Sequence, residues 1–248
     1  MTDNFDSYES HYTRVCNTPP NWDAAEETPE KYACTRPWLP ARTDARILDF
    51  GCGWGQQLLG LWCAGYKNIE GVEMVNGQAQ ICLEQVNGRV PITCMDGREY
   101  LADKNCAYDL IILNDVLEHF QTSEAMGLLK TLKLALRSGG TLVIRVPNMA
   151  NIFASYSRYL DITHVAGYTE YSLMQLLDQA GFVDHRMVLP VFGVHLRQWR
   201  PWAPWRGLSL RPRIDQLLHK FLYWLRGHTK PSCYDHNIEI YTHKSKAD

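Results

Sequence analysis

The sequence predicts an α/β protein built on a doubly wound, mostly parallel seven-stranded sheet, with one helical segment before the sheet and another before the last strand. Two observations lead to this fold class. First, short apolar runs alternate with segments of helical periodicity through residues 45–192. Second, polar side chains stand at or near the ends of four successive apolar runs. Such alternation is typical of a parallel sheet with helices on both faces.

The first half of the domain is expected to contain three strand–helix pairs. Residues 45–50 (ARILDF) form the mostly apolar run of a strand buried on both faces, and residues 55–65 carry large apolar side chains at helical spacing. The following pairs are a strand at 68–75 with a helix at 76–87, and a strand at 91–96 with a short helix at 97–103.

The second half continues the pattern. A strand at 108–117 precedes a helix at 123–137, with Ser123 as its expected N-cap and Ser138-Gly139-Gly140 as its end. The remaining elements are a strand at 141–148, a helix at 169–182, a strand at 185–191 and a last strand at 237–244.

Composition limits the class of protein. The 248-residue chain has 46% apolar residues, enough for the core of one large domain, and a formal net charge of −2, which gives no general attraction to nucleic acid. No apolar run reaches the roughly 18 residues of a membrane span, and the first residues are polar, so we expect a cytoplasmic protein. The eight cysteines form no C-x-x-C pair, which favours reduced thiols.

Four segments are expected: a helical N-terminal cap at 1–44, the α/β domain at 45–192, a basic Trp-rich helical insertion at 193–232, and the last strand and tail at 233–248. Residues 186–230 hold nine Lys or Arg residues and one acid. Three tryptophans spaced three apart (Trp199, Trp202 and Trp205) precede an amphipathic stretch. A packed insertion, a site for sugars or phosphates, contact with an anionic membrane surface, and stacking and phosphate contacts with an RNA all fit this segment.

Three glycines (Gly51, Gly53 and Gly55) lie at the predicted first strand-to-helix turn, directly after Asp49 and Phe50. Glycines permit positive φ and let a ligand reach the backbone, and the next helix offers its N-terminal amides. A dinucleotide site would read G-x-G-x-x-G, and a carboxylate beside it would repel a pyrophosphate. The acid instead favours a ligand with a positive group, while a tight turn without a ligand is the simpler alternative.

Polar side chains stand at or near the ends of four predicted strands: Asp49, Glu73, Asp96 and the pair Asn114/Asp115. In open parallel sheets the ligand lies beyond the carboxyl ends of the strands. The set therefore predicts one site at that edge, although Asp96 alone would also serve as a helix cap.

The segment ILDFGCGWG (47–55) resembles the first motif of class I S-adenosylmethionine-dependent methyltransferases, and the resemblance extends over about residues 40–185. It implies that Asp49 and the glycine turn hold the methionine part of the cofactor, that Glu73 accepts the ribose hydroxyls, and that Asp96 takes the adenine amino group. The implied cofactor-binding set is completed by Gln56, Met74, Met95, Gly97 and Asn114. Dinucleotide enzymes share the ribose acid, so a Rossmann oxidoreductase that binds NAD is one alternative, and a non-catalytic relative of the fold is another.

Acceptor chemistry is expected beyond the fourth and fifth strands. Histidine is the usual side chain for proton transfer near neutral pH. His164 is the first candidate for the base because it lies in the loop after the fifth strand, with His119 second and Asp115 or Tyr168 next. The alternative for each histidine is a purely structural role.

The pattern D-x-x-E-H (115–119) resembles the E-x-x-E-H pattern of ubiquinone-type O-methyltransferases and small-RNA 2′-O-methyltransferases. That resemblance implies a site for a divalent cation, Mg²⁺ or Mn²⁺, on Glu118, His119 and His164. The shorter Asp115 replaces the first glutamate of the pattern, so metal-assisted O-methylation of a small molecule or RNA is kept as an alternative.

Residues 138–148, with YLDITH (159–164) and the helix after it, resemble bacterial methyltransferases that act on sugars of surface polysaccharides and O-antigens. This implies O-methylation of a hydroxyl, or a phosphate-linked group, on a sugar. The expected partner is therefore a small-molecule or glycan acceptor, with no nucleic acid and with the oligomeric state open.

Overall fold

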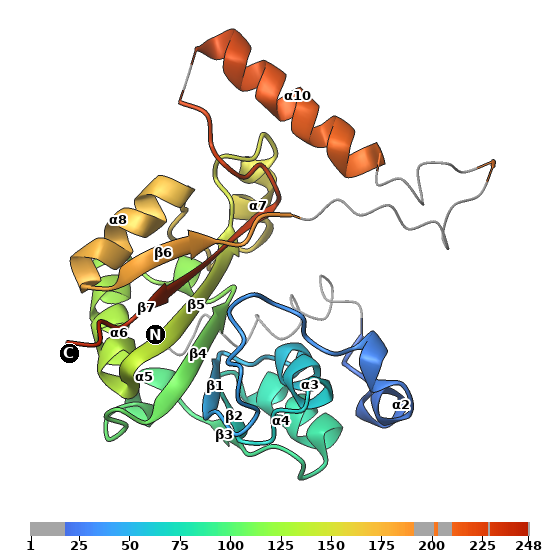
Figure 1. Ribbon diagram of the computed structural model, residues 1–248, viewed down its shortest axis with the longest axis vertical. Coiled ribbons are helices and arrows are strands. Elements are labelled where there is room, and N and C mark those ends of the chain that lie inside the picture. The colour runs from blue at the N-terminus through green and yellow to red at the C-terminus, as the bar shows by residue number, and fades with distance from the viewer. Residues whose placement is uncertain (1–17, 191–200, 203–209, 228, 248) are drawn as a thin grey trace.

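The computed structural model describes residues 18–190, 201–202, 210–227 and 229–247. Its centre is a seven-stranded sheet in the order β3-β2-β1-β4-β5-β7-β6 (Figure 1). The neighbouring strands from β3 to β5 are parallel, and β7 runs antiparallel to β5 and β6. The predicted doubly wound, mostly parallel seven-stranded sheet is confirmed.

All seven predicted strands are present. They are β1 (Ile47–Phe50), β2 (Ile69–Glu73), β3 (Ile92–Cys94), β4 (Tyr108–Asn114), β5 (Leu136–Pro147), β6 (Val183–Met187) and β7 (Asn237–His243). The predicted end of the fourth strand was wrong, because Asp115 adopts a positive φ of 55° and turns the chain out of the sheet. The fifth strand begins five residues early, where Leu136 pairs with Tyr108. The sixth strand lies at Val183–Met187 instead of 185–191, and residue 191 is outside the described part.

The described helices are α2 (Trp22–Glu27), η2 (Pro29–Lys31), α3 (Gln56–Cys63), α4 (Asn76–Val86), α5 (Gly97–Tyr100), η3 (Leu117–His119), α6 (Thr122–Ala135), α7 (Ala154–Leu160), α8 (Glu170–Ala180) and α10 (Leu210–Arg226). Ser123 is not the N-cap of α6. Gln121 takes that position, and its backbone N–H donates to Glu124 at 3.1 Å. The α7 helix was not predicted. In the N-terminal cap the described residues contain only α2 and η2 as helices.

Helices cover both faces of the sheet, with α3 and α4 on one side and α6 and α8 on the other (Figure 1). Alternate residues of one strand point to opposite faces. In β1, Ile47 belongs to the core under α3 and α4, whereas Leu48 belongs to the core under α6 and α8. Because both faces are buried, the strands are fixed in register and their carboxyl ends meet at one edge.

Within the predicted insertion, α10 is helical, whereas the other described residues (201–202, 227 and 229–232) are not. Of the three tryptophans, Trp202 is exposed, while Trp199 and Trp205 lie outside the described residues. No described helix has the length and apolar content that crossing a membrane requires. The seven described cysteines form no disulfide among themselves.

Candidate active site

The glycine turn connects β1 to α3 as predicted. Gly51, Gly53 and Gly55 have φ values of 76°, 53° and 87°, a region that side chains rarely adopt. Space also requires glycine, because a Cβ on Gly51 would lie 2.6 Å from Val116 Cγ2 and one on Gly55 would lie 2.9 Å from Cys82 Sγ. Because Val116 lies so close to Gly51, the glycine turn packs against the loop that follows β4.

A buried carboxylate lies beneath this turn. Asp49 is 1% exposed, and its Oδ2 has no hydrogen-bond partner among the described residues. Burial and the nearby charge of Glu73 raise the pKa of Asp49 to about 7, and the positive charge of Arg145 opposes this shift. An unpaired buried carboxylate oxygen is costly in a resting protein, so this atom fits a ligand with a positive or hydrogen-bond-donating group.

Glu73 supports the turn directly. Its Oε2 accepts the Gly53 N–H and its Oε1 accepts the Val75 N–H, each at 2.9 Å. Burial raises the pKa of Glu73, while the hydrogen bonds from these backbone groups lower it. A carboxylate has about four acceptor positions, so each oxygen can still accept a further bond from a ligand hydroxyl. Together, Asp49 and Glu73 fit the charge and the diol of S-adenosylmethionine.

The residues after β3 have structural partners. The Asp96 side chain caps α5 by accepting the Arg98 N–H at 2.8 Å, and it pairs with the Arg98 guanidinium at 2.6 Å. Hydrogen bonds from Arg98 lower the pKa of Asp96. A Cβ on Gly97 would lie 2.3 Å from the Phe50 ring, so glycine is needed for packing at this position. The helix-cap alternative for Asp96 is therefore present in the structure.

The other implied cofactor residues lie along the same edge. Gln56 and Met74 are exposed, and Met95 is partly buried against the core. Asn114 ends β4 and donates its Nδ2 to Gln57 Oε1 at 3.3 Å. Sequence reasoning missed Gln57. The signal for it is its position one residue after Gln56, in the first turn of α3.

The loop after β4 holds the predicted acidic residues. Asp115 is ion-paired with Arg145 of β5, a partner that sequence reasoning missed. Glu118 is 1% exposed, and neither side-chain oxygen has a hydrogen-bond partner among the described residues. Burial and the charge of Asp115 raise the pKa of Glu118 well above its ordinary value. The Glu118 backbone carbonyl accepts the N–H groups of residues 165 and 166 at 2.9 and 3.0 Å, which ties this loop to the segment carrying His164.

The two predicted histidines meet, with ring centroids 4.9 Å apart in an edge-to-face arrangement. His164 Nδ1 lies 3.0 Å from the Ser157 carbonyl, which can only accept, so Nδ1 carries the proton and Nε2 the lone pair. His119 Nδ1 lies 2.8 Å from Thr163 Oγ1. That hydroxyl donates to Asp161 at 2.7 Å, so His119 Nδ1 is also the donor. Burial, followed by the charge of His164, lowers the pKa of His119 to about 4.

Glu118, His119 and His164 converge as a candidate cation site. One ligand atom from each lies within 4.8 Å of the other two. In each histidine, Nδ1 has a fixed hydrogen-bond partner. Histidines in protein metal sites are held in the same way, because the nitrogen that does not bind the metal donates its N–H to a fixed group. The nearby Tyr168 hydroxyl is buried without a described partner, and burial and Glu118 raise its pKa to about 12. These donors fit a divalent metal.

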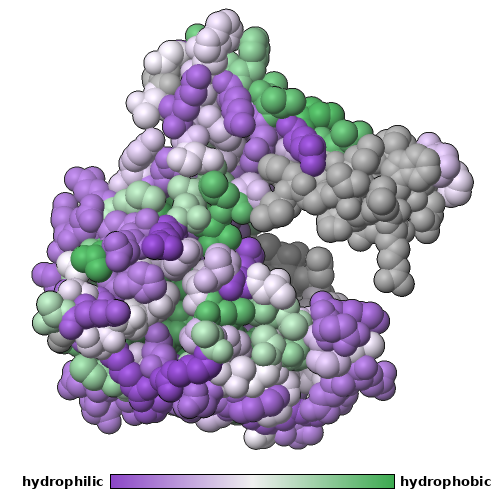
Figure 2. All heavy atoms as spheres, in the orientation of Figure 1, coloured by the Kyte–Doolittle hydropathy of each residue, from purple (hydrophilic) through white to green (hydrophobic). Residues whose placement is uncertain are grey.

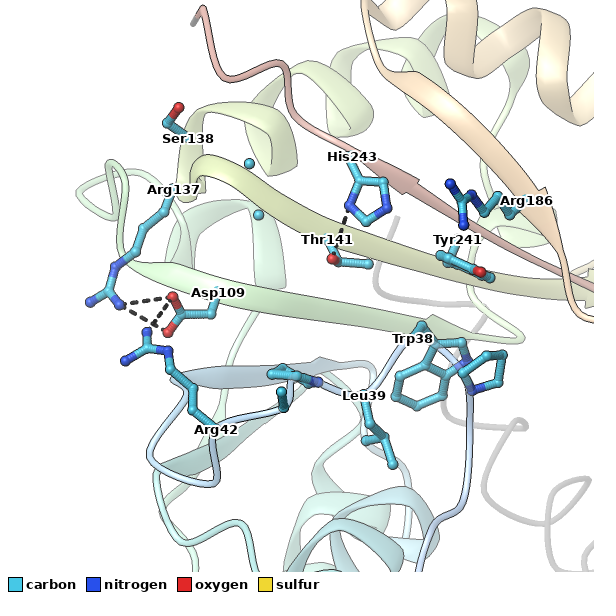
Figure 3. A pocket seen from close by; sticks show the side chains of 15 residues that line it. Trp38, Leu39, Arg42, Asp109, Arg137, Ser138, Thr141, Arg186, Tyr241 and His243 are labelled. Atoms are coloured by element: carbon cyan, nitrogen blue, oxygen red, sulfur yellow. Dashed lines mark hydrogen bonds and ion pairs between the residues drawn. The ribbon is translucent and has the colours of Figure 1, made fainter.

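A cavity of about 530 Å³ lies elsewhere, at the amino ends of the central strands (Figure 3). Arg42 and Arg137 point toward Asp109 there, at 2.7 and 2.9 Å, and Thr141 bonds His243. The cavity shares no lining residue with the glycine turn or the histidine cluster. We therefore place the candidate active site at the carboxyl edge of the sheet and not in this cavity.

Known proteins share the sequence pattern and the fold of this chain. Residues 25–186 match the family model described as a methyltransferase domain. A SAM-dependent methyltransferase from Archaeoglobus fulgidus superposes with a TM-score of 0.64 at 18% identity, over 96% of this chain and 99% of that chain. A possible histamine N-methyltransferase from Thermotoga maritima gives a TM-score of 0.59 at 16% identity, over 97% of both chains.

A phosphoethanolamine N-methyltransferase from Haemonchus contortus, in complex with phosphomonomethylethanolamine and S-adenosylhomocysteine, gives a TM-score of 0.56 at 18% identity. That match covers 99% of this chain and 58% of the other. No curated protein matches the sequence significantly. At such identities the superpositions show the fold alone.

Proposed function

The chain belongs to the methyltransferase-domain family, and from this premise we propose that it uses S-adenosylmethionine to methylate a hydroxyl oxygen of a sugar. The cofactor supplies an electrophilic methyl group on a sulfonium, which is a good leaving group. The protein must therefore align the acceptor and remove its proton. The observation that carries the proposal is the cluster of His119, His164 and Glu118 at the carboxyl edge of the sheet.

In this proposal Asp49 and the glycine turn hold the methionine part of the cofactor, and Glu73 accepts the ribose hydroxyls. The unpaired Oδ2 of Asp49 and the spare lone pairs of Glu73 support these roles. Met95 borders the adenine. Asp96 accepts a hydrogen bond from the adenine amino group, because its bonds to Arg98 leave lone pairs on its carboxylate oxygens. Gln56, Met74, Gly97 and Asn114 complete the cofactor site.

His164 is the proposed base, because its tautomer leaves Nε2 as the acceptor. When Nε2 takes the acceptor proton, the Ser157 carbonyl at 3.0 Å continues to hold Nδ1–H and fixes the ring. His119 is second, because burial lowers its pKa to about 4 and so reduces its capacity to take a proton at neutral pH. Asp115 is third, because its carboxylate is already paired with Arg145.

Exposed aromatic side chains near this base support a sugar acceptor. Phe153, Tyr156 and Tyr159 are 55%, 70% and 78% exposed, and the last two lie on α7 directly before the His164 loop. Arg158 stacks over the Tyr159 ring at 5.5 Å. Aromatic rings pack on the apolar face of a sugar, and an arginine can bind its polar or phosphorylated groups. A glycan of surface polysaccharide is the acceptor that fits this arrangement and the sequence resemblance.

Mass spectrometry of the surface glycan from a strain lacking the gene tests this proposal. We expect one sugar to lose a methyl ether, and the wild-type gene should restore it, whereas a His164→Ala gene should not. A matched control is His185→Ala, which removes a histidine of β6 that bonds Asp178 and Thr242. An unchanged glycan in the deletion strain would contradict the sugar acceptor.

A second candidate is metal-assisted O-methylation of a small molecule or RNA. It is favoured by the convergence of one carboxylate and two imidazole nitrogens within 4.8 Å. A divalent cation at these atoms would acidify a bound hydroxyl, and the histidines would then be ligands. If a chelator abolishes methyl transfer and Mg²⁺ or Mn²⁺ restores it, this mechanism replaces direct base catalysis. If the chelator has no effect, the metal mechanism fails.

A further inference from the structure

Helix α10 presents an apolar stripe to solvent. Its exposed large apolar residues are spaced three or four apart, which places them along one side of the helix. They are Ile214, Leu217, Leu218, Phe221, Trp224 and Leu225, with exposures from 47% to 65%. Figure 2 shows these hydrophobic surfaces gathered along α10, in contrast to the largely hydrophilic surface below.

The opposite side of α10 fixes its orientation. His219 is fully buried, and its Nε2 accepts the Ile152 N–H at 3.1 Å, while its Nδ1 donates to the Asp215 carbonyl at 2.8 Å. The Tyr223 hydroxyl donates to the Ala150 carbonyl at 2.9 Å. These bonds attach the helix to the loop before α7, so the apolar stripe is held facing outward.

The charges beside the stripe are positive. Arg213, Lys220 and Arg226 are exposed on α10, and Asp215 is its one acidic residue. This helix lies within residues 186–230, which hold nine Lys or Arg and one acid, whereas the rest of the chain holds 16 Lys or Arg and 26 Asp or Glu. A second copy of the chain on this stripe would bring like charges together, whereas an anionic lipid surface would neutralise them.

We propose that α10 docks the enzyme on an anionic membrane surface, with its apolar stripe inserted among the lipid headgroups and its cations on phosphates. An amphipathic helix that is too short and too charged to cross a bilayer binds in this way. The loop of residues 150–152 that holds α10 leads into α7 and the His164 loop. Docking therefore brings the acceptor side of the enzyme to the lipid surface. Membrane binding itself does not depend on the proposed acceptor.

Co-sedimentation of the full chain with phosphatidylcholine vesicles, with and without phosphatidylglycerol, tests this inference. We expect binding only to the anionic vesicles, weakened by salt because the attraction is screened. The double variant Lys220→Gln/Arg226→Gln should lower the partition coefficient about 25-fold, since each basic residue contributes about fivefold. The double variant Phe221→Ser/Trp224→Ser should lower it about tenfold or more.

The matched control is Leu134→Ser, which removes a 61% exposed leucine from α6 and should leave vesicle binding unchanged. Because every altered side chain is exposed, the variants should keep their thermal midpoint and their affinity for S-adenosylhomocysteine. Equal binding to both vesicle types, or none to the anionic ones, would overturn the proposal. So would a dimer in light scattering that Phe221→Ser/Trp224→Ser dissociates, because a second copy would then cover the stripe.

Discussion

Replacing Glu73 with glutamine separates the two tasks that we assign to this side chain. Both carboxylate oxygens accept backbone N–H groups at 2.9 Å, from Gly53 and Val75. Glutamine has one acceptor oxygen, so one buried N–H would lose its partner, at a cost of about 1–3 kcal/mol to folding. For a chain of this size, that lowers the thermal midpoint by roughly 2–12 °C.

The same substitution removes a charged acceptor for the ribose hydroxyls. A hydrogen bond to a charged group contributes about 1.5–3 kcal/mol, so the affinity for S-adenosylhomocysteine should fall about 10- to 150-fold in isothermal titration. The control is Glu70→Gln on the same strand, whose carboxylate bonds Tyr100 and Arg46 instead. Unchanged affinity in a folded Glu73→Gln protein, or an equal loss in Glu70→Gln, would refute the assignment.

Three further predictions concern the proposed base His164, the buried carboxylate of Asp49 and the packing of Gly97. His164→Ala should lower turnover by about 10²- to 10⁴-fold with S-adenosylhomocysteine affinity nearly unchanged, because a general base acts on the acceptor alone. In the folded protein the pKa of Asp49 is raised from 3.8 to about 7, so the unliganded folded protein keeps a proton that the unfolded chain loses. The free energy of unfolding should therefore fall as the pH rises between these two values. Cofactor affinity should rise from about pH 6 to 8, because the carboxylate then ionises. Gly97→Ala should destabilise the fold by about 1–3 kcal/mol in denaturant unfolding, because its Cβ would lie 2.3 Å from the Phe50 ring. Gly127→Ala, with nothing within 4 Å on α6, should be neutral or stabilising.

Each of these predictions has a result that contradicts it. Near-normal turnover in His164→Ala would show that the acceptor does not bind beside this loop. Asp115 or Tyr168 would then be the next residue to test. A pH dependence of cofactor binding that persists in Asp49→Asn would assign the titration to another group. Equal stability of Gly97→Ala and Gly127→Ala would show that the Phe50 contact does not restrict this turn.

The sheet and the glycine turn could be predicted because both depend on local chemistry. Apolar runs buried on both faces identify strands, and three glycines with positive φ identify the turn after β1. Errors occurred where a distant contact decides the local structure. Asp115 ends β4 early in a positive-φ turn beside its ion pair with Arg145, which lies 30 residues further along the chain.

The sequence named the residues that we propose for the acceptor side, but it did not predict how they approach one another. The motif around Glu118 and His119 and the later His164 were all identified, yet their approach depends on backbone bonds from residues 165 and 166 to the Glu118 carbonyl. Sequence spacing carries no signal for such a contact. The same holds for the orientation of α10, which the buried His219 fixes through Ile152, 67 residues away.

A crystal structure of the full chain with S-adenosylhomocysteine would show whether the cofactor lies over the glycine turn. We predict density over the turn of Gly51 to Gly55, with the ribose hydroxyls on Glu73 and the amino acid part beside Asp49. The sulfur should point toward the cluster of His119 and His164. Density at another place, for example in the cavity beside Asp109 at the amino ends of the strands, would contradict the account.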